Sequence, residues 1–384
     1  MRPLEGVTVV SIEQAVAAPF ATRQLADAGA RVIKVERPGP GDFAREYDET
    51  VRGMSSHFVW LNRSKESVAL DLKTEHGREV MQRLVANADV FVQNLAPGAA
   101  ARLGLGADQL HESHPELIHC SISGYGGGGP YTEKKAYDLL VQCEAGLLSI
   151  TGSPDAPAKV GISIADIAAG MYAYTGILTA LLRRHVAQRG ATIEISMLEA
   201  LAEWMGFPMY YAVYGGTPLP RTGASHAAIA PYGPFSCQDG KLVFIGIQNQ
   251  REWGIFCESV LGKPALVEDP RFSSNSRRVT HRTDLTEEIS IIFHTMASEE
   301  VIARLDAANI ANARLRDMFE LAEHPQLEAR RRWAEVDSPV GSLRTLIPPA
   351  TLDGDEPVMG RIPESGEHTA AVLAELGISE EGSW

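Results

Sequence analysis

The chain has 384 residues, of which 45% are hydrophobic and 22% are charged, and its formal net charge is -14 at pH 7. Single hydrophobic cores stop growing at roughly 250–300 residues, so we expect one large domain and one smaller one. The composition argues against a disordered chain, and the negative charge argues against nucleic acid or an anionic membrane surface as the main partner. A small anionic ligand remains compatible with the sequence if cations gather locally.

Four isolated cysteines bear on the compartment and on metal binding. Cys120, Cys143, Cys237 and Cys257 form no C-x-x-C motif and accompany no His pair at metal-binding spacing. This usage predicts a reducing compartment and no metal site. The opening residues, MRPLEGVTVVSIEQ, lack the apolar core and the cleavage site of a secretory signal, so we expect a cytoplasmic protein.

The first 125 residues alternate short β-branched runs with amphipathic helical patterns. Helices are expected at 19–30, with Pro19 in its first position, and at 74–88. Strands are expected at 6–12, 31–36, 67–72, 89–94 and 117–126. Strands rich in Val and Ile that alternate with helices are typical of βαβ units around a parallel sheet. The pattern therefore predicts an α/β fold with a Rossmann-like, doubly wound large domain.

The second half of the chain begins with helical patterns, which include residues 191–207, and then changes character. Residues 214–235 are rich in Gly, Pro and Ala without periodicity, which indicates a linker. A smaller α/β unit follows, with a strand at 241–247 and helices near 250–261, 283–296 and 298–308. We therefore expect a large domain over 1–212, a linker over 213–235, a small domain over 236–312 and a return to the large domain over 313–384.

The first strand, turn and helix are arranged as in a dinucleotide-binding unit, and Glu36 ends the second strand. The turn EQAVAAP at 13–19 contains no glycine, although the G-x-G-x-x-G motif needs glycine for the backbone to approach a pyrophosphate. The sequence therefore argues against a nicotinamide or flavin cofactor. The stretch GYGGGGPY at 124–131 lacks the Lys and Ser/Thr of a P-loop, so a flexible loop and a ligand-binding loop both fit it.

Several cations follow expected strands. Arg37, Arg102, Lys134 and Lys135 lie in segments between predicted elements. Each one alone is typical of an ordinary solvated surface charge. Several at one end of a sheet would form an electropositive mouth that suits phosphates.

One long apolar run contains a single charged side chain. Between Lys159 and Arg183 the only charge is Asp166. The spacing S-x-x-D from Ser163 to Asp166 fits a capping box, so a capped core helix explains the carboxylate. The alternative is a nucleophile that the helix dipole holds ionised while apolar neighbours exclude water. A membrane span fits poorly, because Gly, Ser and Thr dilute the run.

The motifs taken together resemble the class III CoA-transferases, which include formyl-CoA transferase, carnitine CoA-transferase and α-methylacyl-CoA racemase. The resemblance covers most of the chain and rests on PLEGVTVVSIE, GARVIKVERPGPGD, NRSKESVALDLK, DVFVQNLAPG, LIHCSISGYGGGGPY and ISIADIAAGMYAY in this order. It implies a homodimer of two interlocked rings. Each subunit would contain a Rossmann-like large domain with a parallel sheet and a smaller inserted α/β domain.

The resemblance also implies a reaction and a set of site residues. Asp166 falls on the family's catalytic aspartate, which forms a mixed anhydride and then an aspartyl-CoA thioester. Coenzyme A would enter as part of the acyl-CoA substrate, with no permanently bound cofactor. The positions implied to contact CoA are Val16, Arg37, Leu70, Asn94, Arg102, Lys135, Tyr137 and Met197.

Two departures from the family pattern bear on the reaction. Tyr137 stands where racemase members have a histidine, and racemisation needs an acid/base pair at the α-carbon. The missing histidine argues against a racemase, so a 2-methylacyl-CoA racemase is the alternative function and not the leading one. A non-catalytic CoA-binding protein comes third. The segment GIQNQ at 246–250 is not the all-glycine loop of formyl-CoA transferase, which argues against oxalate as the acceptor.

The substrate is expected to be a small dicarboxylic acid. The segments SISGYG and SHAAIAPYGPF are most similar to members that use succinyl-CoA with acids of the itaconate, mesaconate, citramalate or hydroxymethylglutarate type. A second carboxylate calls for an Arg or His near the nucleophile. The candidates are Arg45, Arg221, His226 and Gln248.

Overall fold

The computed structural model describes residues 2–350 and 352–378, and within them the chain forms two compact units. The large unit contains the residues up to Gly146, Val160–Gly206 and those from Leu327 onward, and the small unit contains Leu147–Lys159 and Phe207–Gln326. These boundaries differ from the expected 213, 236 and 313. The reason is that the expected linker contains the end of helix α10 (Gly206–Gly215) and most of strand β7 (Tyr232–Ser236), which pairs with β8 (Leu242–Gly246).

Six parallel strands form the sheet of the large unit, in the order β3-β2-β1-β4-β5-β6. Val10 at the centre aligns with Ile33 on one side and Phe91 on the other. The strands are β1 (Thr8–Ile12), β2 (Arg31–Glu36), β3 (Lys65–Ala69), β4 (Val90–Gln93), β5 (Ile118–Ser123) and β6 (Ala191–Ser196). The five expected strands and the parallel Rossmann-like sheet are confirmed, with β3 beginning two residues earlier than predicted.

The edge strand β6 corrects the prediction of a helix over 191–207. In the sequence ATIEIS, side chains alternate with the period of a strand, and six consecutive residues pair with β5. Gly190 lets the chain enter this strand, because a Cβ there would lie 1.9 Å from the carbonyl oxygen of Leu117. The helical pattern applies only from Met197, where α9 (Met197–Trp204) begins.

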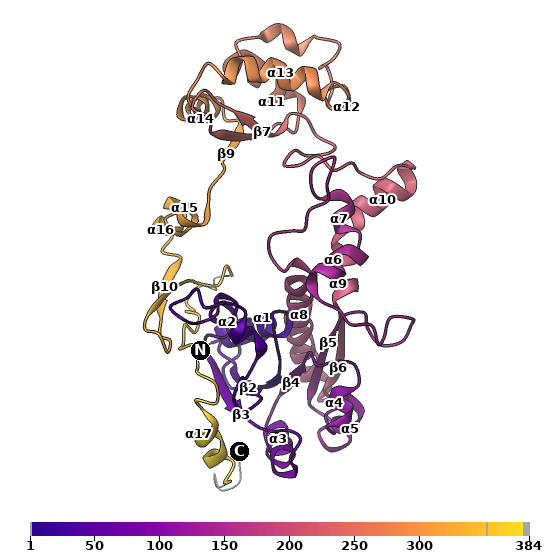
Figure 1. The fold of residues 1–384 in the computed structure, drawn as a ribbon, viewed down its shortest axis with the longest axis vertical. Helices are drawn as coiled ribbons and strands as arrows, with labels where there is room; N and C mark the ends of the chain where they lie inside the picture. Colours follow the sequence, from indigo (N-terminus) through magenta and orange to yellow (C-terminus); the bar gives the residue numbers. More distant parts are fainter. Residues whose placement is uncertain (1, 351, 379–384) are drawn as a thin grey trace. The chain divides into compact units, whose positions relative to one another are not determined.

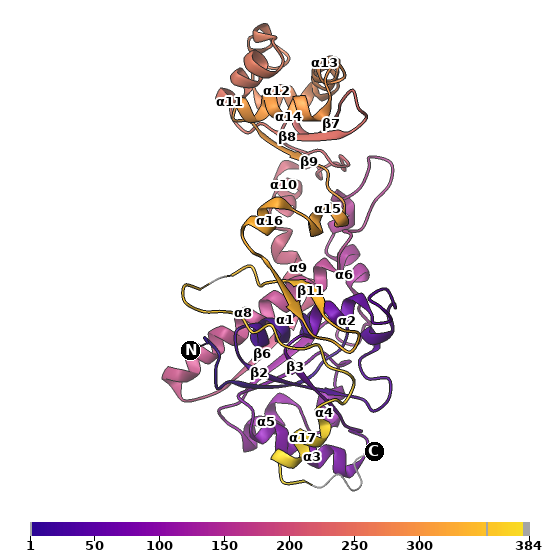
Figure 2. The same cartoon turned by 90° about the vertical axis from the view of Figure 1, so that its left-hand side faces the viewer.

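Helices cover both faces of this sheet (Figures 1 and 2). On one face, α3 (Glu75–Ala86), α5 (Ala107–Ser113) and α17 (Thr369–Glu375) contribute Leu84, Leu110 and Leu373 to a core with Val10 and Ile33. On the other face lie α1 (Ala17–Asp27) and α8 (Ile164–Ala187), which pack against each other. The expected helix 19–30 thus begins earlier, and Pro19 takes its third position instead of its first.

The apolar run around Asp166 is α8, and small residues bring it close to α1. A Cβ at Gly170 would lie 2.6 Å from the carbonyl oxygen of Ala17 and 3.2 Å from Cβ of Phe20. By length and hydropathy alone, α8 is the one helix of the described residues that is able to cross a membrane, with a mean hydropathy of 1.3 and 39% of that window buried. Its buried side, which includes Ala168, Ala169 and Ala173, packs as a core helix against α1 and the sheet.

The small unit has its own core beneath the antiparallel sheet β7-β8-β9. Trp253, Phe256, Phe272 and Phe293 fill it. The expected strand at 241–247 is confirmed as β8, and the expected helices are confirmed in α11 (Gln250–Ile255) with η2 (Phe256–Val260), α13 (Arg282–Phe293) and α14 (Ser298–Ala307). The remaining elements here are η3 (Pro264–Val267), α12 (Asn275–Thr280), β9 (Ala311–Arg314) and α15 (Met318–Ala322).

Short elements complete the chain. They are η1 (Phe43–Glu46), α2 (Ser56–Leu61), α4 (Ala99–Arg102), α6 (Asp138–Glu144), α7 (Leu147–Ile150), α16 (Pro325–Ala329), β10 (Trp333–Val336) and β11 (Leu343–Leu346). The last two strands form an antiparallel pair in the large unit.

Candidate functional site

Residues implied to contact CoA lie at one edge of the parallel sheet. All parallel strands end at the same edge, and ligands of open α/β sheets bind there. Arg37, Leu70, Asn94 and Met197 directly follow β2, β3, β4 and β6. Val16 lies in the same position after β1, where it precedes the first residue of α1. The topology therefore gathers segments that are far apart in the sequence into one site.

The centre of this edge is the point where the strand order reverses, between β1 and β4. There the side chain of Asn94 joins the two loops: its Nδ2 donates to the carbonyl oxygen of Gln14 (2.8 Å), and its Oδ1 accepts from the N–H of Gln14 (2.9 Å). A doubly wound sheet binds its ligand in the crevice at this switch point. The amide of Asn94 thus fixes the loops on both sides of the expected binding crevice.

Three of the four cations flagged in the sequence are available at the surface. Arg37, Arg102 and Lys135 are exposed, and none of them forms an ion pair with another described residue. Lys134, by contrast, is paired with Glu144 and lies 4.1 Å from the ring centroid of Tyr131. Exposed guanidinium and ammonium groups are suited to phosphate oxygens. Of the four cations, Arg37, Arg102 and Lys135 are therefore the ones that remain candidates for the predicted electropositive mouth.

Asp166 lies in the first turn of α8 and is half-buried. The expected capping box is wrong: Ser163 takes the N-cap position, but its side chain makes no capping hydrogen bond. Asp138 caps the helix instead, because its Oδ1 accepts from the N–H of Ala165 (2.8 Å) and from that of Asp166 (3.3 Å). The N-terminus of α8 is therefore capped by Asp138 and not by Ser163.

Asp138 was missed in the sequence, and a buried amide holds it in place. Nε2 of Gln142, which is fully buried, donates to Oδ2 of Asp138 (2.6 Å), while its Oε1 accepts from the N–H of Val160 (3.1 Å). The signal for this pair was the spacing of Asp and Gln by four residues, which places both on one face of α6. Both oxygens of Asp138 are therefore engaged.

Burial raises the pKa of Asp166 to about 7, and the neighbouring charge of Asp138 adds to the rise. This direction is opposite to the expectation that the helix dipole holds the carboxylate ionised. The N–H groups at the start of α8 that would stabilise a negative charge already donate to Asp138. A carboxylate of raised pKa is more basic, and it is a stronger nucleophile once it is ionised.

The N-terminus of α1 lies near that of α8 and, unlike it, has no side-chain cap. Gly170, one turn after Asp166 on the same face of α8, contacts Ala17, and Gln24 farther along α1 reaches Met171. The two helices therefore run parallel, with their N-termini at the same edge of the sheet. This arrangement places the first turn of α1 about one helical turn along α8 from Asp166.

Two backbone N–H groups at this helix start are buried. Ala17 is 2% exposed and Ala18 is 0% exposed, and no side chain caps α1. Between residues 2 and 350, neither N–H donates to a protein acceptor, whereas Phe20 donates to the carbonyl of Val16 (2.8 Å). Donors aimed at a position beside a nucleophile stabilise the oxyanion that forms there.

One backbone donor of the glycine loop after β5 is used within the loop itself. The N–H of Gly126 donates to Oγ of Ser123 (3.0 Å), so this donor is already used. Gly128 and Gly129 adopt positive φ values of 76° and 103°, and a Cβ at either would meet open space. The segment is a surface loop whose free donors are not held by packing.

Two tyrosines lie near Asp166. The pKa of Tyr47 is raised to about 12, first by burial and then by the charges of Asp42 and Asp166, which places Tyr47 within electrostatic reach of Asp166. Tyr137 precedes α6 directly, and its side chain is 68% exposed. Tyr47 was missed in the sequence, where one aromatic residue in a loop carries no signal.

Arg45, a candidate for the second carboxylate, is committed to the structure of the large unit. Its Nη2 and Nε contact the carboxylate of Glu36 (2.7 and 2.9 Å), and its guanidinium carbon lies 3.7 Å from the ring centroid of Phe58. A bidentate pair of this kind leaves little capacity for a substrate. The structure therefore does not support Arg45 as a substrate ligand.

The other three candidates belong to the small unit. Arg221 donates to the carbonyls of Ser153 (2.9 Å) and Pro154 (3.0 Å). Nδ1 of His226 accepts from the N–H of Ala228 (3.1 Å), and its ring stacks on Tyr232. Gln248 is exposed. None of these residues lies in the same unit as Asp166.

Comparison with known proteins gives a consistent result. The sequence model of CoA-transferase family III matches residues 4–369. The chain is 32% identical over 387 residues to the succinyl-CoA:glutarate CoA-transferase of Mus musculus, with 100% of this chain and 88% of that protein covered. It is 32% identical to the succinate–glutarate CoA-transferase of Agrobacterium fabrum, with 97% and 96% covered.

Two further relatives extend the comparison. A formyl-CoA:oxalate CoA-transferase of Escherichia coli is 32% identical over 404 residues, with 99% of this chain and 97% of that protein covered. The crystal structure of a CAIB/BAIF family protein from Brucella suis is similar with a TM-score of 0.86 and 32% identity, and 98% of this chain and 99% of that chain are covered.

Proposed function

The chain belongs to CoA-transferase family III and is an enzyme that transfers CoA between carboxylic acids, and from this premise we propose that Asp166 carries the transfer covalently. The observation that carries the proposal is the position of Asp166 at the crevice edge of the sheet, beside the two buried N–H groups of α1. In this arrangement the nucleophile comes from α8 and the oxyanion donors come from α1, and Gly170 allows the two helices to pack closely.

The first half of the reaction releases the donor acid. The Asp166 carboxylate attacks the thioester carbonyl, the C–S bond breaks, and the products are a mixed aspartyl anhydride and CoA thiolate. The thiolate then attacks the aspartyl carbonyl of the anhydride. This step forms an aspartyl-CoA thioester and expels the donor as a carboxylate. The N–H groups of Ala17 and Ala18 stabilise the oxyanion in each addition.

The second half repeats these steps in reverse. The acceptor carboxylate attacks the aspartyl-CoA thioester, which gives a new anhydride and CoA thiolate. The thiolate attacks the acceptor's carbonyl, forms the product acyl-CoA and frees Asp166. The raised pKa of Asp166 makes the ionised carboxylate a good nucleophile, while its apolar neighbours keep water from the activated intermediates.

We further propose succinyl-CoA as the donor and a small dicarboxylic acid of the glutarate or hydroxymethylglutarate type as the acceptor. Relatives from a mammal and a bacterium that are 32% identical to this chain act on succinate and glutarate. The exposed Arg37, Arg102 and Lys135 suit the phosphates of CoA. Itaconate, mesaconate and citramalate belong to the same acid class and enter the same test.

The test is a panel of acceptor acids supplied with succinyl-CoA, with the acyl-CoA products identified by mass spectrometry. We expect glutarate and related dicarboxylates to give product, and oxalate, formate and monocarboxylates to give much less. Preferred turnover of oxalate would contradict the substrate proposal. Exchange of deuterium into a 2-methylacyl-CoA without any acceptor acid would favour an isomerase instead.

We also infer a homodimer, which is supported by apolar surface on α10. No residue of this helix is buried, and its aromatic side chains Phe207, Tyr210 and Tyr214 are 58%, 59% and 81% exposed. Large exposed apolar patches mark interaction surfaces. Light scattering should give twice the 41.5 kDa mass of the chain, and a monomer at micromolar concentration would contradict the inference.

A further inference from the structure

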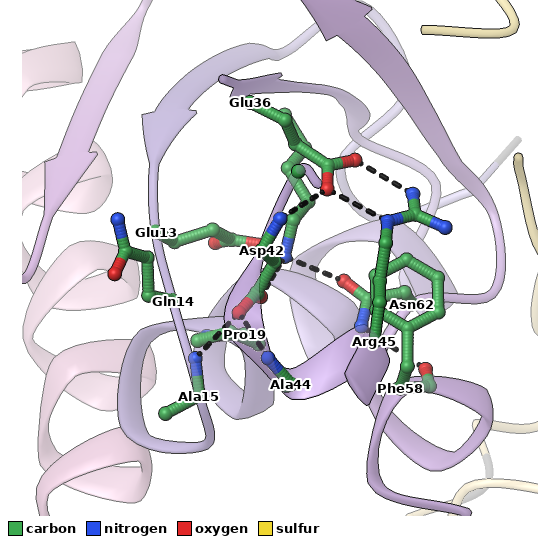
Figure 3. Close-up of polar contacts among 12 residues, drawn as sticks. Glu13, Gln14, Ala15, Pro19, Glu36, Asp42, Ala44, Arg45, Phe58 and Asn62 are labelled. Atoms are coloured by element: carbon green, nitrogen blue, oxygen red, sulfur yellow. Dashed lines mark hydrogen bonds and ion pairs between the residues drawn. The ribbon is translucent and has the colours of Figure 1, made fainter. Parts of the chain in front are cut away.

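The carboxylate of Asp42 joins two loops of the proposed site to a buried ion pair (Figure 3). Its Oδ1 accepts from the N–H of Ala15 (3.1 Å) and from that of Ala44 (2.9 Å). Its Oδ2 accepts from Nζ of Lys34 (2.6 Å). Asp42 is 1% exposed, so all three contacts are made away from solvent.

The ion pair belongs to a buried network between the sheet and α1. Glu13 contacts Nζ of Lys65 (2.6 Å) and Nζ of Lys34 (3.6 Å), and Oδ1 of Asn62 accepts from both lysines (3.1 and 3.2 Å). Burial alone would raise the pKa of Glu13, but Lys65 and Lys34 outweigh it and the pKa is lowered. The two lysines therefore favour the ionised form of Glu13.

A second carboxylate ties the network to the loop after β2. Oε2 of Glu36 accepts from the backbone N–H of Asp42 (2.9 Å) and from Nε of Arg45 (2.9 Å). Three cations, Lys34, Lys65 and Arg45, thus balance the carboxylates of Glu13, Glu36 and Asp42. Buried charges persist only when they are paired in this manner.

The two backbone contacts of Asp42 lead to two segments, the turn before α1 and η1. Ala15 adopts φ = 61°, a conformation that residues with a Cβ rarely take, and such turns persist only where surrounding contacts hold them. The turn continues into Val16 and the uncapped start of α1. Ala44 belongs to η1, which Asp42 caps and which ends directly before Tyr47.

We propose that Asp42 is a positioning residue of the transferase. Its Oδ1 holds the Ala15 turn, and with it the oxyanion donors of α1, in a fixed position relative to the segment that contains Tyr47. This inference rests on the proposed function of Asp166. It assigns to Lys34, Glu13 and Lys65 the role of fixing the Asp42 carboxylate. None of these network residues needs to touch the substrate.

The test compares two double variants that differ only in the oxygen offered to the N–H groups of Ala15 and Ala44. Lys34→Met with Asp42→Asn keeps an oxygen at this position, whereas Lys34→Met with Asp42→Leu replaces it with an apolar side chain of similar shape. Both variants remove one cation and one anion together, so Glu13 keeps Lys65 and Glu36 keeps Arg45. Removing both partners of a buried pair avoids the unpaired charge that single variants leave.

We expect the Asn variant to keep most of the activity and the Leu variant to lose about 100-fold in kcat/KM, because a misplacement of about 1 Å in a site costs that much. The midpoint of the pH–rate profile should stay unchanged in both, since Asp138 and burial set it. Equal kcat/KM in the two folded variants would overturn the proposal.

Asp27→Asn is the control for lost stability alone. Asp27 is similarly buried and paired with Arg63 (2.7 Å) and Arg23 (3.2 Å), but it lies at the far end of α1. This variant should melt at a lower temperature and keep its kcat/KM. A loss of kcat/KM as large as that of the Leu variant would show that destabilisation, and not positioning, explains the effect.

Hydrogen exchange on residues 13–20 tests the positioning without any need for activity. We expect the amide of Ala15 to be protected before CoA is added in the wild type and in the Asn variant, and to exchange freely in the Leu variant. Rapid exchange in the wild type would overturn the proposal. Failure of the wild type to bind CoA in calorimetry would instead contradict the proposed function and leave this exchange result unaffected.

Discussion

The N-termini of α1 and α8 lie side by side, and they are finished in opposite ways. Asp138 caps α8 and accepts from the N–H groups of Ala165 and Asp166, while no side chain caps α1, and no described residue accepts from the buried N–H groups of Ala17 and Ala18. One helix end holds a carboxylate whose pKa is raised, and the other offers hydrogen-bond donors. In the proposed mechanism this difference divides the tasks of nucleophile and oxyanion binding between two similar helix ends.

The largest expected effect is the loss of the nucleophile. Asp166→Asn keeps the shape of the side chain but cannot form an anhydride, so kcat should fall by at least about 1,000-fold. Rates are measured with succinyl-CoA and the best acceptor of the panel, with CoA binding by calorimetry as the control for folding. Retention of most of the transferase activity would show that Asp166 is not the nucleophile.

The next effect comes from giving α1 the cap that α8 has. Val16→Asp places a carboxylate at the start of α1, where it competes with the reaction's oxyanion for the same donors, and kcat should fall by about 100-fold. Ala297→Asp is the matched control, because α14 also lacks a side-chain cap and lies in the small unit. If both variants keep the wild-type kcat, the donors of α1 have no role in catalysis.

A smaller effect should appear in the pH dependence. The free enzyme's kcat/KM should rise with pH through about 7, because Asp166 must be ionised to attack. Asp138→Asn removes the neighbouring negative charge while keeping an oxygen for the helix cap, so the midpoint should move down by on the order of one pH unit. The part of the pKa rise of Asp166 that burial causes remains in this variant. An upward shift would show that the charge of Asp138 does not act on Asp166.

The last expected effect is on stability. A carboxyl group whose pKa is raised on folding binds its proton more tightly in the native state, so wild-type stability should fall as pH rises from about 4 to about 7. Asp166→Asn has no carboxyl group to ionise at this position. It should be more stable than the wild type at pH 8 by on the order of 2–4 kcal/mol, with little difference at pH 4. Urea unfolding at the two pH values measures it; a variant less stable at pH 8 would contradict the assigned pKa.

The parallel sheet was predictable because each of its central strands is a short run of Val and Ile. The edge strand β6 was not, since ATIEIS precedes a long helical pattern without a break, and only its alternation distinguishes it. The small unit's sheet was predictable in part, through KLVFIGI. The boundary of the small unit was not predictable, because the Gly- and Pro-rich segment before it contains regular structure that its composition does not indicate.

At the site, the sequence marked the residue with unusual surroundings and missed the residues that support it. Asp166 was noticeable as the one charge in an apolar run, whereas Asp138 lies among ordinary polar residues and acts through a contact 28 residues away. The donors of Ala17 and Ala18 are backbone groups, which no residue type announces. Lys34 carried a signal that was overlooked: a lysine in the middle of a buried strand requires a buried partner.

The most direct test of the account is trapping of the covalent intermediate. The wild-type enzyme is incubated with succinyl-CoA and hydroxylamine, digested, and mapped by mass spectrometry, with Asp138 as the internal control because its carboxylate is engaged in capping α8. The account predicts a hydroxamate on Asp166 that requires succinyl-CoA, and none on Asp138. Full transferase turnover with Asp166 unmodified under these conditions would contradict it.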